Sequence, residues 1–101
     1  MNTVEKRIRA LLQGATMMQL ATVHGAQPWC CTVYFVADDD LNLYWISTPE
    51  RRHSREIEMH AKVAAAIPIK YVPGKDVVGI QAEGDATLVN DEDEMKKAID
   101  V

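Results

Sequence analysis

The strongest constraint on the fold comes from short runs of apolar, β-branched or aromatic residues that turn signals separate. These runs are MMQLATV (17–23), WCCTVYFVA (29–37), LNLYWIS (41–47), VAAAIPI (63–69) and VVGIQAEGDATLV (77–89). Each has the length and residue types of a β-strand. The first two flank HGAQP and therefore predict a hairpin, and the acidic tripeptide 38–40 predicts the next turn.

The last run carries the clearest alternation in the chain. Its apolar face consists of Val78, Ile80, Ala82, Ala86 and Leu88. Its polar face consists of Gln81, Glu83, Asp85 and Thr87. Gly84 interrupts the pattern and predicts a bulge or a sharp bend, as barrels need where a strand turns a corner.

Capping signals predict the helices. Asn2 and Glu5 form a potential capping box, and Gly14 ends the first helix. Val4, Ile8, Leu11 and Leu12 form its apolar stripe.

Thr48 is the predicted N-cap of a second helix, with Pro49 at its first position. This helix extends to about Lys62, with Ile57 and Ala61 facing inward. Asn90-Asp91 with Glu94 predicts a last helix.

This order predicts a mainly β fold with flanking helices, in one domain that spans residues 1–101. The formal charge of -4 argues against nucleic acid or an anionic membrane as partner. No apolar run reaches the roughly 20 residues of a membrane span, and no signal-peptide pattern is present. Cys30 and Cys31 are adjacent and therefore unsuited to pair with each other, so we expect a reduced, cytoplasmic protein.

Common catalytic motifs are missing from the sequence, and no catalytic residue is identified. His53 and His60 lie two turns apart on the predicted second helix, so we expect no metal site. The acidic residues at 38–40 and 91–94 are interpreted as ordinary solvated positions in a turn and a helix cap.

The segment STPERRHSRE (47–56) is unusually basic for an acidic chain. Arg51, Arg52 and His53 fall in the first turn of the predicted helix, where the helix dipole disfavours cations. A bound phosphate would accept hydrogen bonds from the free backbone N–H groups and from these side chains. Alternatively, the arginines pair along the helix surface with Glu50, Glu56 and Glu58. The pattern alone leaves both interpretations open.

Four segments in order, LATVHGAQPW, CTVYFVADDDLNLYWIST, PERRHSREIEMHAKVAAAI and GIQAEGDATLV, cover most of the chain. Together they resemble the flavin-binding split-barrel superfamily typified by pyridoxamine 5'-phosphate oxidase. The resemblance implies an antiparallel Greek-key split β-barrel that forms a homodimer, with FMN at the subunit interface. Relatives continue beyond the last predicted helix, so the resemblance also implies either a C-terminal truncation or a barrel closed with fewer strands.

The resemblance also assigns the cofactor-binding residues. The strand before the acidic turn runs along the flavin, the end of the next strand contacts its ring or phosphate, and the basic pair 52–53 grips the phosphate. The residues implied are Cys31, Thr32, Val33, Tyr34, Ile46, Ser47, Arg51, Arg52, His53 and Gln81. Better-known members carry Arg-Lys at the basic pair, and a neutral imidazole at His53 neutralises less charge than lysine. Arg51 or Arg55 can supply the missing charge.

The leading hypothesis is therefore an FMN-binding oxidoreductase-like protein that acts on a small-molecule redox substrate. One alternative is a deazaflavin or haem in the same groove. Another is a non-catalytic split-barrel dimer in which Arg51, Arg52 and Arg55 form only surface pairs.

Overall fold

The computed structural model describes residues 2–69, 73–74 and 79–89, and its centre is a hairpin of two long strands. Strands β1 (Met17–His24) and β2 (Gln27–Tyr34) pair antiparallel from Met17↔Tyr34 to His24↔Gln27. The hairpin predicted from the sequence is confirmed, and its strands extend into the HGAQP segment. Only Gly25 and Ala26 remain in the turn, and Gly25 has a φ of +59°, which is the glycine position of a type II′ turn.

Strands β5 (Lys62–Pro68) and β6 (Gly79–Asp85) complete an antiparallel sheet in the order β2-β1-β5-β6. Their register is continuous from Lys62↔Asp85 to Pro68↔Gly79, and Gly84 lies directly opposite Val63. The predicted bulge at Gly84 is therefore wrong.

The predicted strand 77–89 is also too long. Pairing ends at Asp85, after which Ala86 N–H donates to the carbonyl of Ala61 at 2.8 Å. Leu88 beyond it is 83% exposed, so it does not share the buried face that the alternation predicted. Val78, most of the predicted loop 70–76 and the predicted helix after Asn90 lie outside the described residues.

A second, two-stranded sheet pairs β3 (Val36–Ala37) with β4 (Leu43–Tyr44). The predicted strand 29–37 is divided at Phe35, whose N–H donates to the carbonyl of Thr16 at 3.0 Å. This hydrogen bond and the burial of the Phe35 side chain fix the point where the chain leaves one sheet for the other. The predicted strand 41–47 is shortened to its two paired residues.

The turn between β3 and β4 is built around Asp38. Its carboxylate is 6% exposed and accepts hydrogen bonds from four donors. These are Asp40 N–H (3.0 Å), Asn42 N–H (2.8 Å), Asn42 Nδ2 (3.1 Å) and Tyr44 Oη (3.1 Å). Burial raises the pKa of Asp38, but the hydrogen bonds outweigh it and hold the pKa below the usual aspartate value. The interpretation of this position as ordinary and solvated is wrong.

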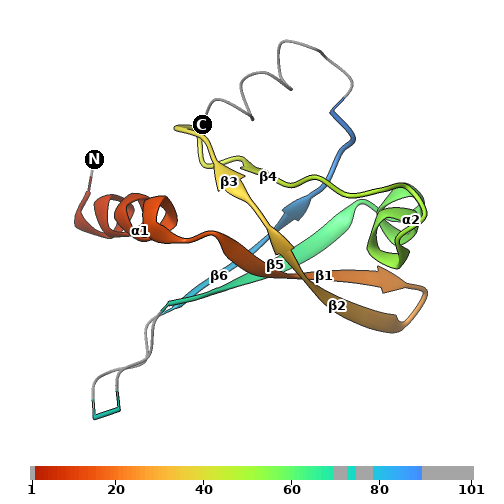
Figure 1. Ribbon diagram of the computed structural model, residues 1–101, viewed down its shortest axis with the longest axis horizontal. Coiled ribbons are helices and arrows are strands. Elements are labelled where there is room, and N and C mark those ends of the chain that lie inside the picture. The colour runs from red at the N-terminus through yellow and green to blue at the C-terminus, as the bar shows by residue number, and fades with distance from the viewer. Residues whose placement is uncertain (1, 70–72, 75–78, 90–101) are drawn as a thin grey trace.

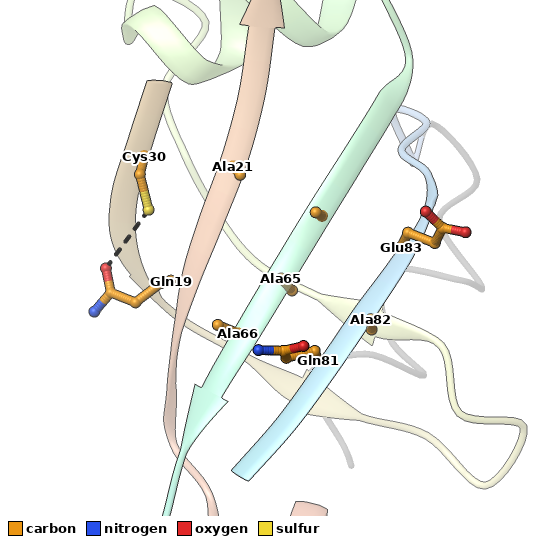
Figure 2. A pocket seen from close by; sticks show the side chains of 9 residues that line it. Gln19, Ala21, Cys30, Ala65, Ala66, Gln81, Ala82 and Glu83 are labelled. Carbon is orange, nitrogen blue, oxygen red and sulfur yellow. Dashed lines mark hydrogen bonds between the residues drawn. The ribbon is translucent and has the colours of Figure 1, made fainter. Parts of the chain in front are cut away.

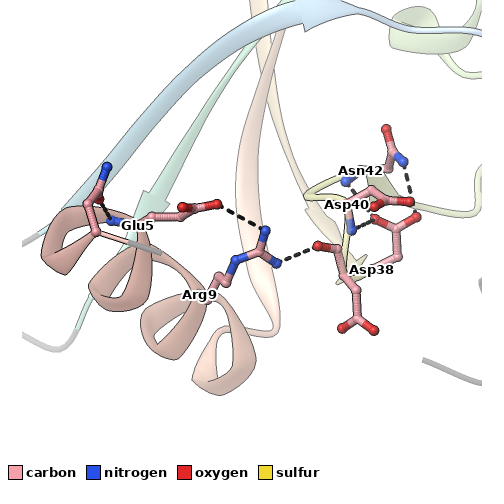
Figure 3. A network of polar contacts seen from close by, with 7 residues as sticks. Glu5, Arg9, Asp38, Asp40 and Asn42 are labelled. Atoms are coloured by element: carbon pink, nitrogen blue, oxygen red, sulfur yellow. Dashed lines mark hydrogen bonds and ion pairs between the residues drawn. The ribbon is translucent and has the colours of Figure 1, made fainter.

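Helix α1 (Thr3–Gly14) forms as its cap predicts, because Asn2 Oδ1 accepts the N–H of Glu5 at 2.7 Å. Its Arg9 pairs with Glu5 at 3.2 Å and donates to the backbone carbonyl of Asp39 (Figure 3). This side chain therefore ties α1 to the Asp38 turn.

Helix α2 (Arg52–Met59) is shorter than predicted at both ends. The carbonyl of Thr48 accepts the N–H of Arg51 at 3.2 Å, so residues 48–51 form a turn and Thr48 is not the cap. Proline suits the second position of a turn as well as the first position of a helix, which explains the error. The helix ends before Lys62, which begins β5, and Ala61 is exposed instead of facing inward. Ile57 packs against the core as predicted.

The core lies on one face of the four-stranded sheet, where buried and more exposed positions alternate along β1. It contains Leu12, Met18, Leu20, Val33, Phe35 and Ile67. In Figure 1, α1 (red) and α2 (green) lie at opposite ends of the longest axis, and α2 lies beside the β1–β2 hairpin. None of the described helices is long and apolar enough to cross a membrane.

Candidate functional site

Exposed apolar side chains mark two of the segments that the sequence assigned to a cofactor. Tyr34, at the end of β2, is 77% exposed, and Ile46, after β4, is 92% exposed. β2 is also the outer strand of its sheet, so one side of its backbone is not paired within the sheet. An exposed aromatic ring beside an open strand edge can take a planar ligand, because both the ring and the backbone groups can contact it.

Cys31 and His53 come together across the interface of β2 and α2, with Sγ and Nδ1 3.3 Å apart. Burial and the nearby Arg51 charge lower the pKa of His53, whereas burial, then Cys30, raises the pKa of Cys31. Both groups are therefore neutral at pH 7, and the contact is a thiol–imidazole hydrogen bond. His53 is buried, and its Nε2 has no hydrogen-bond partner among the described residues. Its side chain adds no positive charge where the resemblance expects a cation.

The first turn of α2 has no side-chain cap. Arg51 occupies the cap position in an extended conformation, and its side chain makes no capping hydrogen bond; no other side chain of the described residues accepts one from the first-turn N–H groups. Ser54 Oγ donates to Ser47 Oγ at 3.2 Å, which brings two hydroxyl groups to this end of the helix. Arg51 forms no ion pair with any described residue. This end can therefore hold an anion through backbone N–H groups, hydroxyls and one guanidinium.

Arg52 has a different set of contacts. Its Nε pairs with Glu56 Oε2 at 3.0 Å, and its guanidinium carbon lies 3.8 Å from the centre of the Trp29 ring. Glu56 is buried and also accepts the hydroxyl of Thr22 at 2.6 Å. These hydrogen bonds lower the pKa of Glu56, and the one from Thr22 has the largest effect.

For Arg52, the helix-surface pair that the sequence left open is thus present. The i,i+4 spacing predicted the contact between Arg52 and Glu56, but no sequence pattern predicted the contact between Glu56 and Thr22.

The remaining predicted residues lie on both faces of the four-stranded sheet. Val33 points into the core, and only its backbone is available to a ligand. Pairing places Thr32 opposite Gln19 on the outer face, where Thr32 Oγ1 donates to Gln19 Oε1 at 2.9 Å. Gln81 also lies on this face, away from His53.

The outer face forms a shallow depression of about 470 Å³ (Figure 2). Alanines form its floor, and Gln19, Cys30, Gln81 and Glu83 surround them. In the described part of the chain, no three His, Cys, Asp or Glu side chains gather as metal ligands would.

Comparison with known proteins gives a consistent result. The family model described as Pyridoxamine 5'-phosphate oxidase matches residues 4–101. Curated protein sequences give no significant match.

Two solved structures share the fold. HutZ, the haem storage protein from Vibrio cholerae, is 21% identical with a TM-score of 0.78, covering 95% of this chain and 70% of HutZ. Atu2129, a protein of unknown function from Agrobacterium tumefaciens str. C58, is 16% identical with a TM-score of 0.73, covering 97% of this chain and 43% of Atu2129. These similarities confirm the split-barrel fold class predicted from the sequence.

Proposed function

Because the chain belongs to the pyridoxamine 5'-phosphate oxidase family, we propose that it binds FMN at the β2 edge and the first turn of α2. The observation that carries the proposal is the uncapped first turn of α2 beside Arg51. Unpaired N–H groups at a helix start favour an anion, and a phosphate would relieve the unfavourable position of Arg51 near the positive end of the helix dipole.

In this proposal Arg51 supplies the positive charge that faces the phosphate. Arg52 and His53 contribute backbone N–H groups, because their side chains are engaged with Glu56 and Cys31. The hydroxyl of Ser47, which accepts a hydrogen bond from Ser54, would donate to the phosphate at the same end. Lys is replaced by a neutral histidine here, so the loss of Arg51 is expected to weaken binding more than the loss of either neighbour.

The flavin ring would lie along residues 31–34, where the open edge of β2 offers N–H and C=O groups. Tyr34 and Ile46, which are both exposed, would cover it. Bound FMN supplies hydride or electron transfer, and the protein positions the ring and a small-molecule substrate. This division of roles fits an oxidoreductase whose sequence carries no catalytic motif.

We further propose that the protein is a homodimer. The outer face of the sheet exposes a row of alanines with one carboxylate, Glu83, among the residues around them, and so much small apolar surface is unusual for a face in water. A second copy would cover it and would add buried area to a small core. Gln81 would then approach the cofactor region of the partner.

Haem is the second candidate, because HutZ, a haem storage protein, shares the fold. Haem carries two carboxylates instead of a phosphate, and the described residues offer a thiol and a histidine at Cys31 and His53. His53 is buried, Cys31 is half-buried, and their side chains are hydrogen-bonded to each other, so they are poorly placed to bind a haem iron. This arrangement favours FMN.

The absorption spectrum of the purified protein separates these candidates. We expect flavin bands near those of free FMN, and release of a compound with the mass of FMN on denaturation. Arg51→Gln should lower FMN affinity by roughly tenfold or more, which is the order of one charge-assisted hydrogen bond. A colourless protein that does not take up added FMN contradicts the proposal, and a Soret band after haem addition favours the second candidate.

A further inference from the structure

The side chains of Cys31 and His53 form a pair that the proposed flavin site leaves unused. That site takes the backbone of residues 31–34 and the backbone N–H groups at the start of α2. The two side chains contact each other instead, with Sγ and Nδ1 3.3 Å apart. They come from β2 and α2, so the tertiary fold brings them together. A thiolate sulfur and an imidazole nitrogen are side-chain ligands that copper and zinc prefer.

The geometry of this contact suits a bridging ion. When the thiol donates, the sulfur and the lone pair of Nδ1 are directed at one proton between them. A metal ion that binds both atoms in a linear arrangement needs an Sγ–Nδ1 separation of roughly 4 Å, which small side-chain rotations supply. His53 is buried but Cys31 is only half-buried, so an ion can enter from the side of Cys31. A single ion fits between two atoms, whereas a haem ring needs open space around its iron.

Charge and ligand number select a univalent ion. A thiolate and a neutral imidazole carry one negative charge together, so a univalent ion forms a neutral complex in this partly buried place. A divalent ion would leave one positive charge near the guanidinium of Arg51. No third His, Cys, Asp or Glu completes the site in the part of the chain that the structure describes, and structural zinc takes four ligands. Cu(I) is univalent, prefers soft sulfur ligands and forms stable complexes with two ligands.

We propose that Cys31 and His53 bind one Cu(I) ion, with Sγ and Nδ1 as its two ligands. The S–H bond of Cys31 breaks, bonds from copper to Sγ and Nδ1 form, and the proton passes to solvent. No electron is transferred, because the metal enters as Cu(I). The expectation of no metal site rested on the spacing of His53 and His60 along one helix, whereas this second ligand comes from a distant strand.

Anaerobic titration of the protein with Cu(I), in competition with a chromogenic Cu(I) chelator, tests the proposal. The protein should bind one Cu(I) ion, and Zn(II) at equal concentration should not displace it. X-ray absorption of the loaded protein should show one sulfur and one nitrogen neighbour at the copper. Two sulfur neighbours without nitrogen overturn the proposal, because they would show that thiols of two molecules hold the ion.

Cys31→Ser is the test variant and Cys30→Ser the matched control, because Cys30 is exposed on the outer face of the sheet. Cys31→Ser should lose the site and Cys30→Ser should retain it. His53→Phe should weaken Cu(I) binding by at least about a hundredfold, since a lost ligand costs no less than a lost partner of a ligand. Equal affinity in wild type and His53→Phe, or equal losses in the two serine variants, overturns the proposal.

The X-ray absorption result needs no variant, so it decides the question even where a variant does not fold. The titration is made without FMN. Failure of the wild type to bind FMN therefore affects only the proposed function, and failure to bind Cu(I) affects only the copper site.

Discussion

The hydroxyl of Thr22 in β1 donates to the carboxylate of Glu56 in α2 at 2.6 Å, between residues 34 positions apart. Glu56 also holds Arg52, so one buried carboxylate connects the sheet, the helix and the guanidinium above Trp29. This connection helps to fix the orientation of α2, and with it the proposed phosphate site at its first turn.

Thr22→Val should therefore destabilise the protein. Valine keeps the shape of threonine but leaves a carboxylate oxygen of Glu56 without its donor in a buried position. We expect the midpoint of thermal unfolding to fall by several degrees. Thr22→Ser keeps the hydroxyl and should lose less. A larger loss in Thr22→Ser than in Thr22→Val would show that packing of the methyl group matters more than the hydrogen bond to Glu56.

Asp38→Asn should destabilise the protein at pH 7, because an amide amino group would face donors that now meet a carboxylate. The hydrogen bonds lower the pKa of Asp38 in the folded state. Its contribution to stability is thus complete above the ordinary aspartate pKa of about 3.9 and is lost as the pH falls through the lower folded-state value.

Urea unfolding between pH 7 and pH 2 checks this prediction. The difference between wild type and Asp38→Asn should shrink below about pH 4. Asp39→Asn, at the exposed neighbour, is the control and should behave as wild type. A difference that does not change with pH would contradict the assignment.

His53 should make stability depend on pH in a second window. Burial and the Arg51 charge lower its pKa in the folded state, so the unfolded chain takes up the proton first as the pH falls. Stability is complete above the ordinary histidine pKa of about 6.5 and declines as the pH falls below it. His53→Phe should remove this part of the decline between pH 7 and pH 5. His60→Gln, at an exposed histidine, should keep it.

Ala66→Arg tests the proposed dimer. A long charged side chain on the outer face of β5 would prevent a second copy from packing there. Light scattering should show the wild type as a dimer and the variant as a monomer. Ala10→Arg, the same change on an exposed position of α1, should remain dimeric. A monomeric wild type would contradict the dimer directly.

Local patterns predicted the strands and the first helix well. The hairpin followed from two β-rich runs around a Gly-containing turn, and β5 formed despite its alanines because β1 and β6 pair with it on both sides. The start of α2 was misplaced because Pro49 fits both a turn and a helix start. Gly84 was misread because a glycine in a strand can also be an ordinary paired residue where space is open.

The site was less accessible to sequence reasoning because its contacts are distant in the chain. Cys31 meets His53 across 22 positions, and no local pattern encodes that contact. Asp38 looked like any turn aspartate, because nothing in the sequence shows that four donors converge on it. The segment 47–55 was identified correctly as basic, but the structure was needed to separate Arg51 at the helix start from Arg52, which pairs with Glu56 and stacks on Trp29.

The division of one extended segment at Phe35 restricts insertions and deletions at this point of the chain. β2 and β3 belong to different sheets but share this segment, and their side-chain faces are set by the same alternation. One residue inserted or deleted beside Phe35 would move the side chains of β2 or of β3 to the opposite face of its sheet, while those of the other strand kept their face. Changes in length should therefore be tolerated far less here than in the Gly25–Ala26 turn.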